Sequence, residues 1–203
     1  MKKLCKRLVA AALATLMLLS LCGCGSITDK AEASVSGMFD AFKALDFEKA
    51  RDYVDVDSMK LSEYDTDEDA DYERYMSTLF DRLDYKIVSS EEVDDETVNV
   101  VVEITAVDMK VVLKDYVSEA LKYAFSNTLE DPQPTEEEMQ QKMEDLFIAS
   151  ATKEGLDTVT SVVTIKVVND DGNWRIVSDD PLVDALFGGL ISAIEEISES
   201  YGG

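Results

Sequence analysis

The sequence predicts an α+β fold, in which helices pack on a mostly antiparallel sheet that carries an inserted pair of helices. Three observations predict it. Apolar residues recur with a helical period in several segments, and in other segments they alternate with polar residues as in strands. Two of the helical segments lie between the segments that alternate. The N-terminus differs, with the pattern of a cleaved signal peptide. We expect a signal peptide at 1–23, a short tether at 24–30 and a single α+β domain at 31–203.

The N-terminal segment has a basic start and a short apolar run. Four basic residues lie within the first seven, an apolar run follows from Leu8 to Leu21, and no acidic residue precedes Asp29. As a helix this run would rise only about 21 Å, which is less than the ~30 Å hydrocarbon core of a bilayer. The pattern therefore predicts a secretion signal and not a membrane-spanning helix.

The end of the apolar run resembles the lipobox of bacterial lipoproteins. Its residues are Leu21-Cys22-Gly23-Cys24. The resemblance implies that Cys24 is joined to diacylglycerol, with Leu21 and Gly23 recognised by the signal peptidase that cuts before it. Cys22 fits worse, because bulky Leu21 would then adjoin the cut, and an ordinary secretory signal with incidental cysteines is the alternative. Two acyl chains, such as palmitate, hold a protein durably on a membrane, whereas one does so only marginally.

Helical spacing predicts three helices after the tether. The first, from Ala31, has an apolar stripe that consists of Val35, Met38, Phe39, Phe42 and Leu45. Asp46 can cap a short second helix that buries Phe47, Ala50 and Tyr53. A third helix follows the acidic connection 55–71, with apolar positions at Tyr72, Tyr75, Met76, Leu79, Phe80 and Leu83.

The pattern then changes to alternation, which predicts strands. Tyr85 and Ile87 begin a first strand, and an acidic turn is expected at Glu91–Glu96. A long second strand carries Val98, Val100, Val102 and Ile104 on one face, and Val101 indicates that part of the other face is covered too.

Two helices are expected between this strand and the next. Asp108 caps the first, whose apolar positions are Val112, Leu113, Tyr116, Val117, Ala120 and Leu121. Pro132 and Pro134 interrupt it, and Thr135 with Glu138 forms a capping box for the second helix. That helix runs to about Lys153, and Gly155 ends it.

The remainder predicts two strands and a helix. A long strand at 158–168 and its partner at 174–177 are joined by a hairpin at 169–173, where Gly and Asn tolerate positive φ. Asp180-Pro181 then opens one helix whose apolar face consists of Val183, Leu186, Phe187, Leu190, Ile194 and Ile197. We expect this face to pack on the sheet or on a partner chain.

Three local sequences also resemble a known family. They are Leu45-Asp46-Phe47-Glu48-Lys49-Ala50 after the first helix, the Ile104-Thr105-Ala106-Val107-Asp108-Met109 junction and the hairpin ending in Trp174. These resemble small lipoproteins of Gram-positive gut bacteria with cone-shaped, nuclear-transport-factor-2-like domains. Over residues 28–180 the resemblance implies a curved, cone-like sheet. The helical pair at 109–153 departs from the plain cone, where strands would continue.

Composition excludes several function classes. The chain has 43 acidic and 19 basic residues, and removing the signal removes four of the basic ones, for a net charge of −28. Such a charge disfavours nucleic acid as a partner and mainly keeps a domain soluble. The chain has no histidine, which excludes histidine-based triads and metal sites, and all three cysteines lie at or before position 24.

One acidic stretch has part of the pattern of a calcium site. Asp65, Asp67 and Asp69 alternate as in the first half of a calcium loop. An EF-hand needs glycine at its sixth position and glutamate at its twelfth, but Ala70 and Met76 stand there. The three aspartates are therefore weak metal candidates, and we predict a solvated acidic loop and no cofactor.

Acid–base catalysis by a carboxylate is the alternative that residue types leave open. It would require a carboxyl group whose pKa is raised by burial, and Asp40, Asp84 and Glu103 are the candidates. Tyr72, Tyr75 and Tyr116 are candidates to line a pocket, although their spacing favours core packing.

The sequence thus favours a non-enzymatic binding or interaction module on the outer face of the cell membrane. Its partners are expected to be the membrane, through the lipid on Cys24, and an unknown small molecule or envelope protein. A lipid-anchored enzyme and a structural envelope protein are the alternatives, and the oligomeric state is open.

Overall fold

The computed structural model describes residues 26–55, 59, 76–80, 82–127 and 134–201. The described elements run in the order α2 (Ile27–Lys43), α3 (Phe47–Ala50), β1 (Asp84–Asp94), β2 (Thr97–Val107), α5 (Met109–Asn127), α6 (Glu136–Ala151), β3 (Thr158–Asp170), β4 (Asn173–Ile176), α7 (Asp180–Leu186) and α8 (Leu190–Tyr201). This confirms an α+β fold with a helical pair inserted between two strands.

The four described strands form one antiparallel sheet in the order β1-β2-β3-β4. Along β2 every second side chain is buried, from Val98 to Ile104, so one face of the sheet meets the core. The β3–β4 hairpin turns at Asp171 and Gly172, which both have positive φ. The expected hairpin is confirmed, with Asp171 at one of the two left-handed positions.

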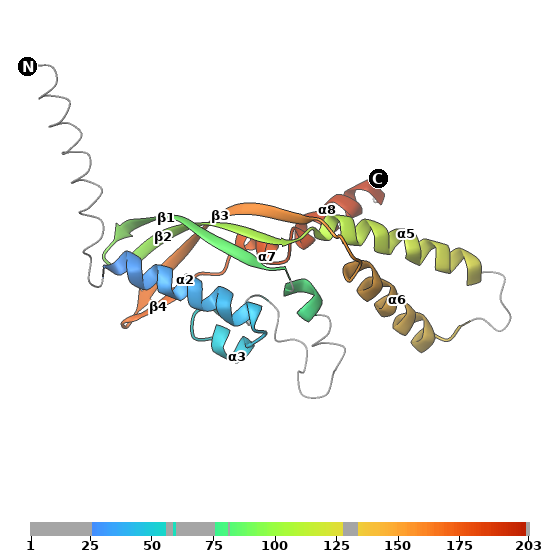
Figure 1. The fold of residues 1–203 in the computed structure, drawn as a ribbon, viewed down its shortest axis with the longest axis horizontal. Helices are drawn as coiled ribbons and strands as arrows, with labels where there is room; N and C mark the ends of the chain where they lie inside the picture. Colours follow the sequence, from blue (N-terminus) through green and yellow to red (C-terminus); the bar gives the residue numbers. More distant parts are fainter. Residues whose placement is uncertain (1–25, 56–58, 60–75, 81, 128–133, 202–203) are drawn as a thin grey trace, which may run out of the picture.

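Helix α2 crosses the buried face of the sheet (Figure 1). Its stripe of Val35, Met38, Phe39 and Phe42 is fully buried, and the ring of Phe39 stacks on Tyr85 of β1 at 4.5 Å between centroids. All buried members of the described core cluster lie between Ala31 and Phe187, so residues 26–203 retain that core.

The predicted caps at the starts of α3 and α6 are confirmed, whereas α6 ends at Ala151 with Thr152 as its C-cap, before the end predicted at about Lys153 and Gly155. The Asp46 side chain accepts a hydrogen bond from the backbone N–H of Lys49, at 3.0 Å, and so caps α3. Thr135 and Glu138 form the expected capping box at the start of α6. Capping satisfies backbone donors that a helix start leaves without partners, which is why these residues mark helix starts reliably.

The structure corrects the predicted boundaries of three further elements. The acidic segment 91–96 is not all turn, because β1 still pairs with β2 up to Asp94, with a register shift between Glu92 and Asp94, and only Asp95 and Glu96 form the turn. The second hairpin strand, expected at 174–177, lies one residue earlier, at Asn173–Ile176. Helix α2 begins at Ile27, capped by Ser26, and so takes up part of the expected tether at 24–30.

A further correction concerns the predicted C-terminal helix, which is two helices. Helix α7 ends at Leu186 and α8 begins at Leu190, with Gly188 and Gly189 between them at φ of +58° and +78°. A helix cannot continue through left-handed residues. The side chain of Asp184 accepts hydrogen bonds from the backbone N–H groups of Ile191 and Ser192, which caps the new helix.

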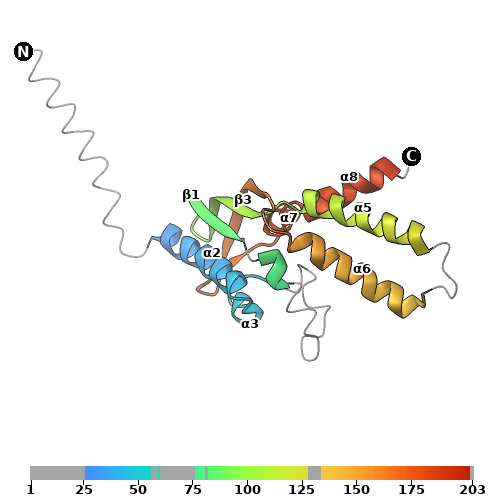
Figure 2. The same cartoon turned by 45° about the vertical axis from the view of Figure 1, so that its right-hand side comes forward.

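The described part of the chain is elongated (Figures 1 and 2). Helix α2 begins at one end of the long axis. Helices α5, α6 and α8 extend from the opposite end of the sheet. The start of α2 and the helical extension therefore lie at opposite ends of the described part of the chain.

Candidate functional site

Helices α5 and α6 form a helical arm that projects beyond the sheet (Figure 1). The two ends of the arm meet at the sheet, where the backbone N–H of Asp108 donates a hydrogen bond to the carbonyl of Asp157, at 3.0 Å. The helices pack on one another, and Tyr116 meets Phe147 edge to face at 5.8 Å between ring centroids. Tyr116 therefore packs within the arm, as its helical spacing favoured.

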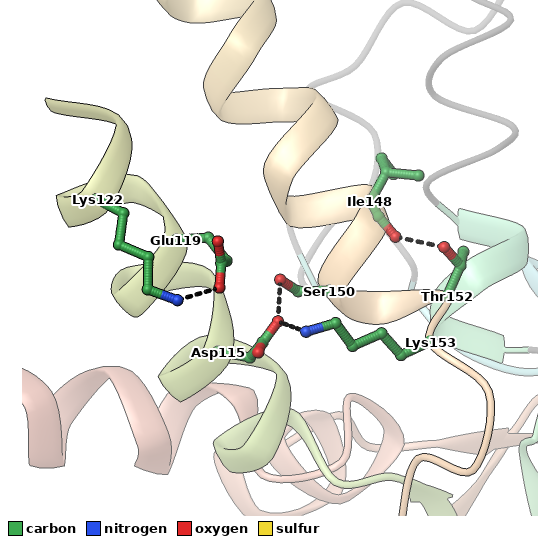
Figure 3. Close-up of polar contacts among 7 residues, drawn as sticks. All are labelled: Asp115, Glu119, Lys122, Ile148, Ser150, Thr152 and Lys153. Atoms are coloured by element: carbon green, nitrogen blue, oxygen red, sulfur yellow. Dashed lines mark hydrogen bonds and ion pairs between the residues drawn. The ribbon is translucent and has the colours of Figure 1, made fainter. Parts of the chain in front are cut away.

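A polar cluster holds the base of the arm together (Figure 3). The Asp115 carboxylate on α5 accepts hydrogen bonds from the hydroxyl of Ser150, at 2.7 Å, and from the Lys153 ammonium, at 2.6 Å. The Lys153 and Ser150 hydrogen bonds lower the pKa of Asp115. A carboxyl group with a lowered pKa is a weak base, so this cluster is suited to holding α5 on α6 and not to proton transfer.

A groove of about 380 Å³ lies between α5 and α8. The two helices start close together, because the backbone N–H of Met109 donates to the carbonyl of Gly188, at 3.0 Å, and Lys110 forms an ion pair with Glu196. The lining residues are Lys110, Lys114, Val117, Ser118 and Leu121 of α5 with Ala193, Glu196 and Ile197 of α8.

Apolar side chains of α5 at the groove and one helical turn beyond it are open to solvent. Leu121 is 48% exposed, and Phe125, one helical turn further along the same stripe, is 75% exposed. The predicted apolar stripe of this helix runs from Val112 to Leu121. Of these residues only Val112 and Leu113 are buried, since the arm leaves the sheet beyond them.

The walls of the groove have opposite charges. The α5 wall carries Lys110 and Lys114. The α8 wall carries Glu196, and Glu199 follows it on the same helix face by the i, i+3 rule. Lys110 and Glu196 already compensate one another across the groove, so its apolar lining is the feature that a partner would cover.

The three candidate catalytic carboxylates do not meet in a pocket. Asp40 and Asp84 are exposed, and Glu103 forms an ion pair with Lys86 across the sheet at 3.4 Å. The hydrogen bond from Lys43 lowers the pKa of Asp84, which is the opposite of the raised pKa that a general acid requires. These positions therefore give no support to acid–base catalysis.

Several predicted residues lie outside the described part of the chain. They are the lipobox residues Leu21, Gly23 and Cys24, the weak metal candidates Asp65, Asp67 and Asp69, and Tyr72 and Tyr75. Within the described residues, no group of three or more acidic side chains is arranged to hold a metal ion. No described helix is both long enough and apolar enough to cross a membrane.

Comparisons with protein families, curated proteins and solved structures found no match to this chain. The relationship to nuclear-transport-factor-2-like lipoproteins therefore stays a prediction. The arm, its groove and the exposed apolar side chains of α5 are therefore the structural features on which a functional proposal can be based.

Proposed function

We propose that this chain is a lipid-anchored protein of the cell envelope and acts as a non-enzymatic interaction module. In this proposal residues 1–23 are cleaved and Cys24 carries the lipid on the outer face of the membrane. The arm and the α5–α8 groove then form the surface that meets a partner. The resemblance to Gram-positive lipoproteins makes the cytoplasmic membrane the expected site of anchorage.

The observation that carries the proposal is the position of the groove relative to the start of α2. Helix α2 begins at one end of the long axis, and α5, α6 and α8 extend from the other (Figure 2). A lipid on Cys24, two residues before Ser26, would hold the first end at the bilayer. The exposed apolar stripe at Leu121 and Phe125 would then face away from the membrane, where a protein partner can reach it.

The interior between α2 and the sheet favours an interaction module over an enzyme with a cone pocket. Phe39 and Phe42 are fully buried there, and Phe42 stacks on Phe80 at 5.5 Å between centroids. A close-packed interior leaves little room for a substrate. We therefore propose that the sheet is cone-like, as in nuclear-transport-factor-2-like domains, and that α2 and its side chains fill the space in which such a cone would hold a ligand.

The anchor is tested with Cys24→Ala and, as a matched control, Cys22→Ala. We expect the control to incorporate labelled palmitate and to partition into the detergent phase, whereas Cys24→Ala does neither. Equal membrane attachment of both variants would overturn the anchor.

The non-enzymatic role is tested by melting residues 26–203 with a panel of metabolites and peptides, and with calcium. We expect no small molecule to raise the midpoint, although a ligand at one hundred times its Kd would add about 2.7 kcal/mol. Reproducible turnover of any panel compound, lost on changing one carboxylate, would overturn it.

A further inference from the structure

The start of α2 lies beside the end of β1. Lys43, at the end of α2, forms an ion pair with Asp84 at the start of β1, at 3.2 Å. Nearer the start of α2, the Ser90 hydroxyl of β1 donates a hydrogen bond to the carboxylate of Glu32, at 2.6 Å. The helix and the strand therefore run in opposite directions, so Ile27 lies near the end of β1 and the turn that follows it.

The two turns at this end of the sheet are acidic. Five acidic residues lie between Glu91 and Glu96, and all of them are exposed. The β3–β4 hairpin adjoins this turn, because the backbone N–H of Asn169 donates to the carbonyl of Glu96, at 2.8 Å, and it adds the exposed Asp170 and Asp171. Both turns lie at the end where α2 begins (Figure 1). We call the acidic residues of 91–96 and 170–171 the acidic end.

Basic residues offset only part of this charge. The exposed Lys30 and Lys166 and the half-buried Arg175 lie on elements that reach the same end. Lys30 directly follows the exposed Asp29 on α2, so this pair adds no net charge. The seven carboxylates of the acidic end therefore outnumber the basic groups near them.

Only a short stretch of chain separates this end from the proposed lipid. Cys24 lies two residues before Ser26, which is the N-cap of α2, and two residues span at most about 7 Å. The Debye length is about 10 Å at 0.1 M salt, so salt does not fully screen charges beside the start of α2 from the headgroups of the membrane.

We propose that the acidic end makes the anchored domain avoid anionic lipid, so that the surface it fits is a lipid surface without net negative charge. This inference rests on the proposed lipid anchor. A basic residue near an anionic leaflet strengthens attachment by about fivefold, and an acidic residue has the opposite effect. The acyl chains then hold the protein on the membrane against this repulsion, which agrees with the two chains expected on Cys24.

Reversible binding to vesicles tests the proposal. Residues 24–203 contain the whole described core and have Cys24 as their single cysteine, so an alkyl maleimide of myristoyl length attaches one chain at the position of the proposed lipid. One such chain binds a bilayer only marginally, which allows the affinity to be measured by vesicle sedimentation.

At about 100 mM salt we expect binding to phosphatidylcholine vesicles to be about tenfold tighter, or more, than binding to vesicles with about 30% phosphatidylglycerol. The ratio of the two affinities is expected to fall towards one at about 1 M salt, where the Debye length is only about 3 Å.

Two sets of four substitutions separate the acidic end from the total charge. The first set neutralises the turn between β1 and β2: Glu91→Gln, Glu92→Gln, Asp95→Asn and Glu96→Gln. Asp94 is kept, because its carboxylate accepts a hydrogen bond from the backbone N–H of Glu96, at 2.9 Å. The control set neutralises four exposed positions on α6 and α8: Glu137→Gln, Glu144→Gln, Asp145→Asn and Glu199→Gln.

The first set is expected to remove most of the difference between the two kinds of vesicle, and the control set to leave it unchanged, with the same circular dichroism spectrum for both. Three results would overturn the proposal: equal affinity for the two vesicles at about 100 mM salt, tighter binding to the anionic vesicles, or an equal effect of the two sets. Since the acyl chain is attached chemically, none of these results bears on lipidation in the cell, which the palmitate experiment decides separately.

Discussion

Replacing Gly188 by alanine should destabilise the domain much more than replacing its neighbour Gly189. Both residues have positive φ, at +58° and +78°, so alanine at either position adopts a left-handed conformation at a cost of about 1–2 kcal/mol. Their surroundings differ. A Cβ on Gly188 would lie 1.8 Å from the carbonyl oxygen of Val107, whereas a Cβ on Gly189 would meet no atom within 4 Å.

The additional cost at Gly188 follows from what must move. The contact is with backbone at the end of β2, so a side-chain rotation cannot relieve it, and the α7–α8 connection must shift away. That shift breaks the hydrogen bond from Met109 to the Gly188 carbonyl and leaves buried groups without partners, at about 1–3 kcal/mol. Disturbed packing around Phe187 adds about 1–3 kcal/mol. Gly188→Ala should therefore cost about 3 kcal/mol or more beyond Gly189→Ala.

Urea unfolding of residues 26–203, followed by circular dichroism, measures both variants against the parent. We expect Gly189→Ala to lose about 1–2 kcal/mol and Gly188→Ala about 4–6 kcal/mol. In a chain of this size the difference corresponds to a separation of melting midpoints of roughly 6–12 °C. Equal losses for the two variants would refute the close approach of Gly188 to Val107.

Two further predictions concern the arm and α2. Asp115→Asn should cost about 0.5–1 kcal/mol at pH 7, since the side chains of Asp115 and Lys153 are both partly exposed. Because the folded pKa of Asp115 is lowered, this advantage of the parent is present above the ordinary carboxyl pKa of 3.8 and is lost as the pH falls below it. Thermal melts from about pH 7 to about pH 2 check this, and a gap that widens in acid would contradict it. Gly37→Ala places a Cβ 2.3 Å from the ring of Tyr53 and should destabilise the parent, but in a Tyr53→Ala background it should stabilise by about 1 kcal/mol through helix propensity. A urea double-mutant cycle without this change of sign would disprove the contact.

Local signals predicted the framework of the fold well. Alternation identified β2, and the side chains of Asp46, Thr135 and Asp108 identified the starts of three helices, because each acts on backbone within a few residues. The acidic turn after Ile87 was placed too early, since charged residues are tolerated on the exposed part of an edge strand such as β1.

The groove could not be predicted from the same signals. The stripe through Leu121 has the helical period of a core helix, and the period does not tell where a helix leaves the sheet. Two consecutive glycines, Gly188 and Gly189, lie inside the predicted C-terminal helix and disfavour it. The close approach of Gly188 to Val107, about eighty residues earlier in the chain, is a tertiary contact that local sequence does not contain.

The closed base of the arm makes it a removable insertion. Val107 and Thr158 are paired directly across β2 and β3, and the adjoining Asp108 and Asp157 are joined by a backbone hydrogen bond. A two-residue turn would connect the two strands as an ordinary hairpin. The sheet would then be a plain four-strand meander. A chain without α5 and α6 is therefore compatible with the same strand topology, but it would lose Met109, Val112 and Ala151 from the core, so the arm contributes to stability as well as to the surface.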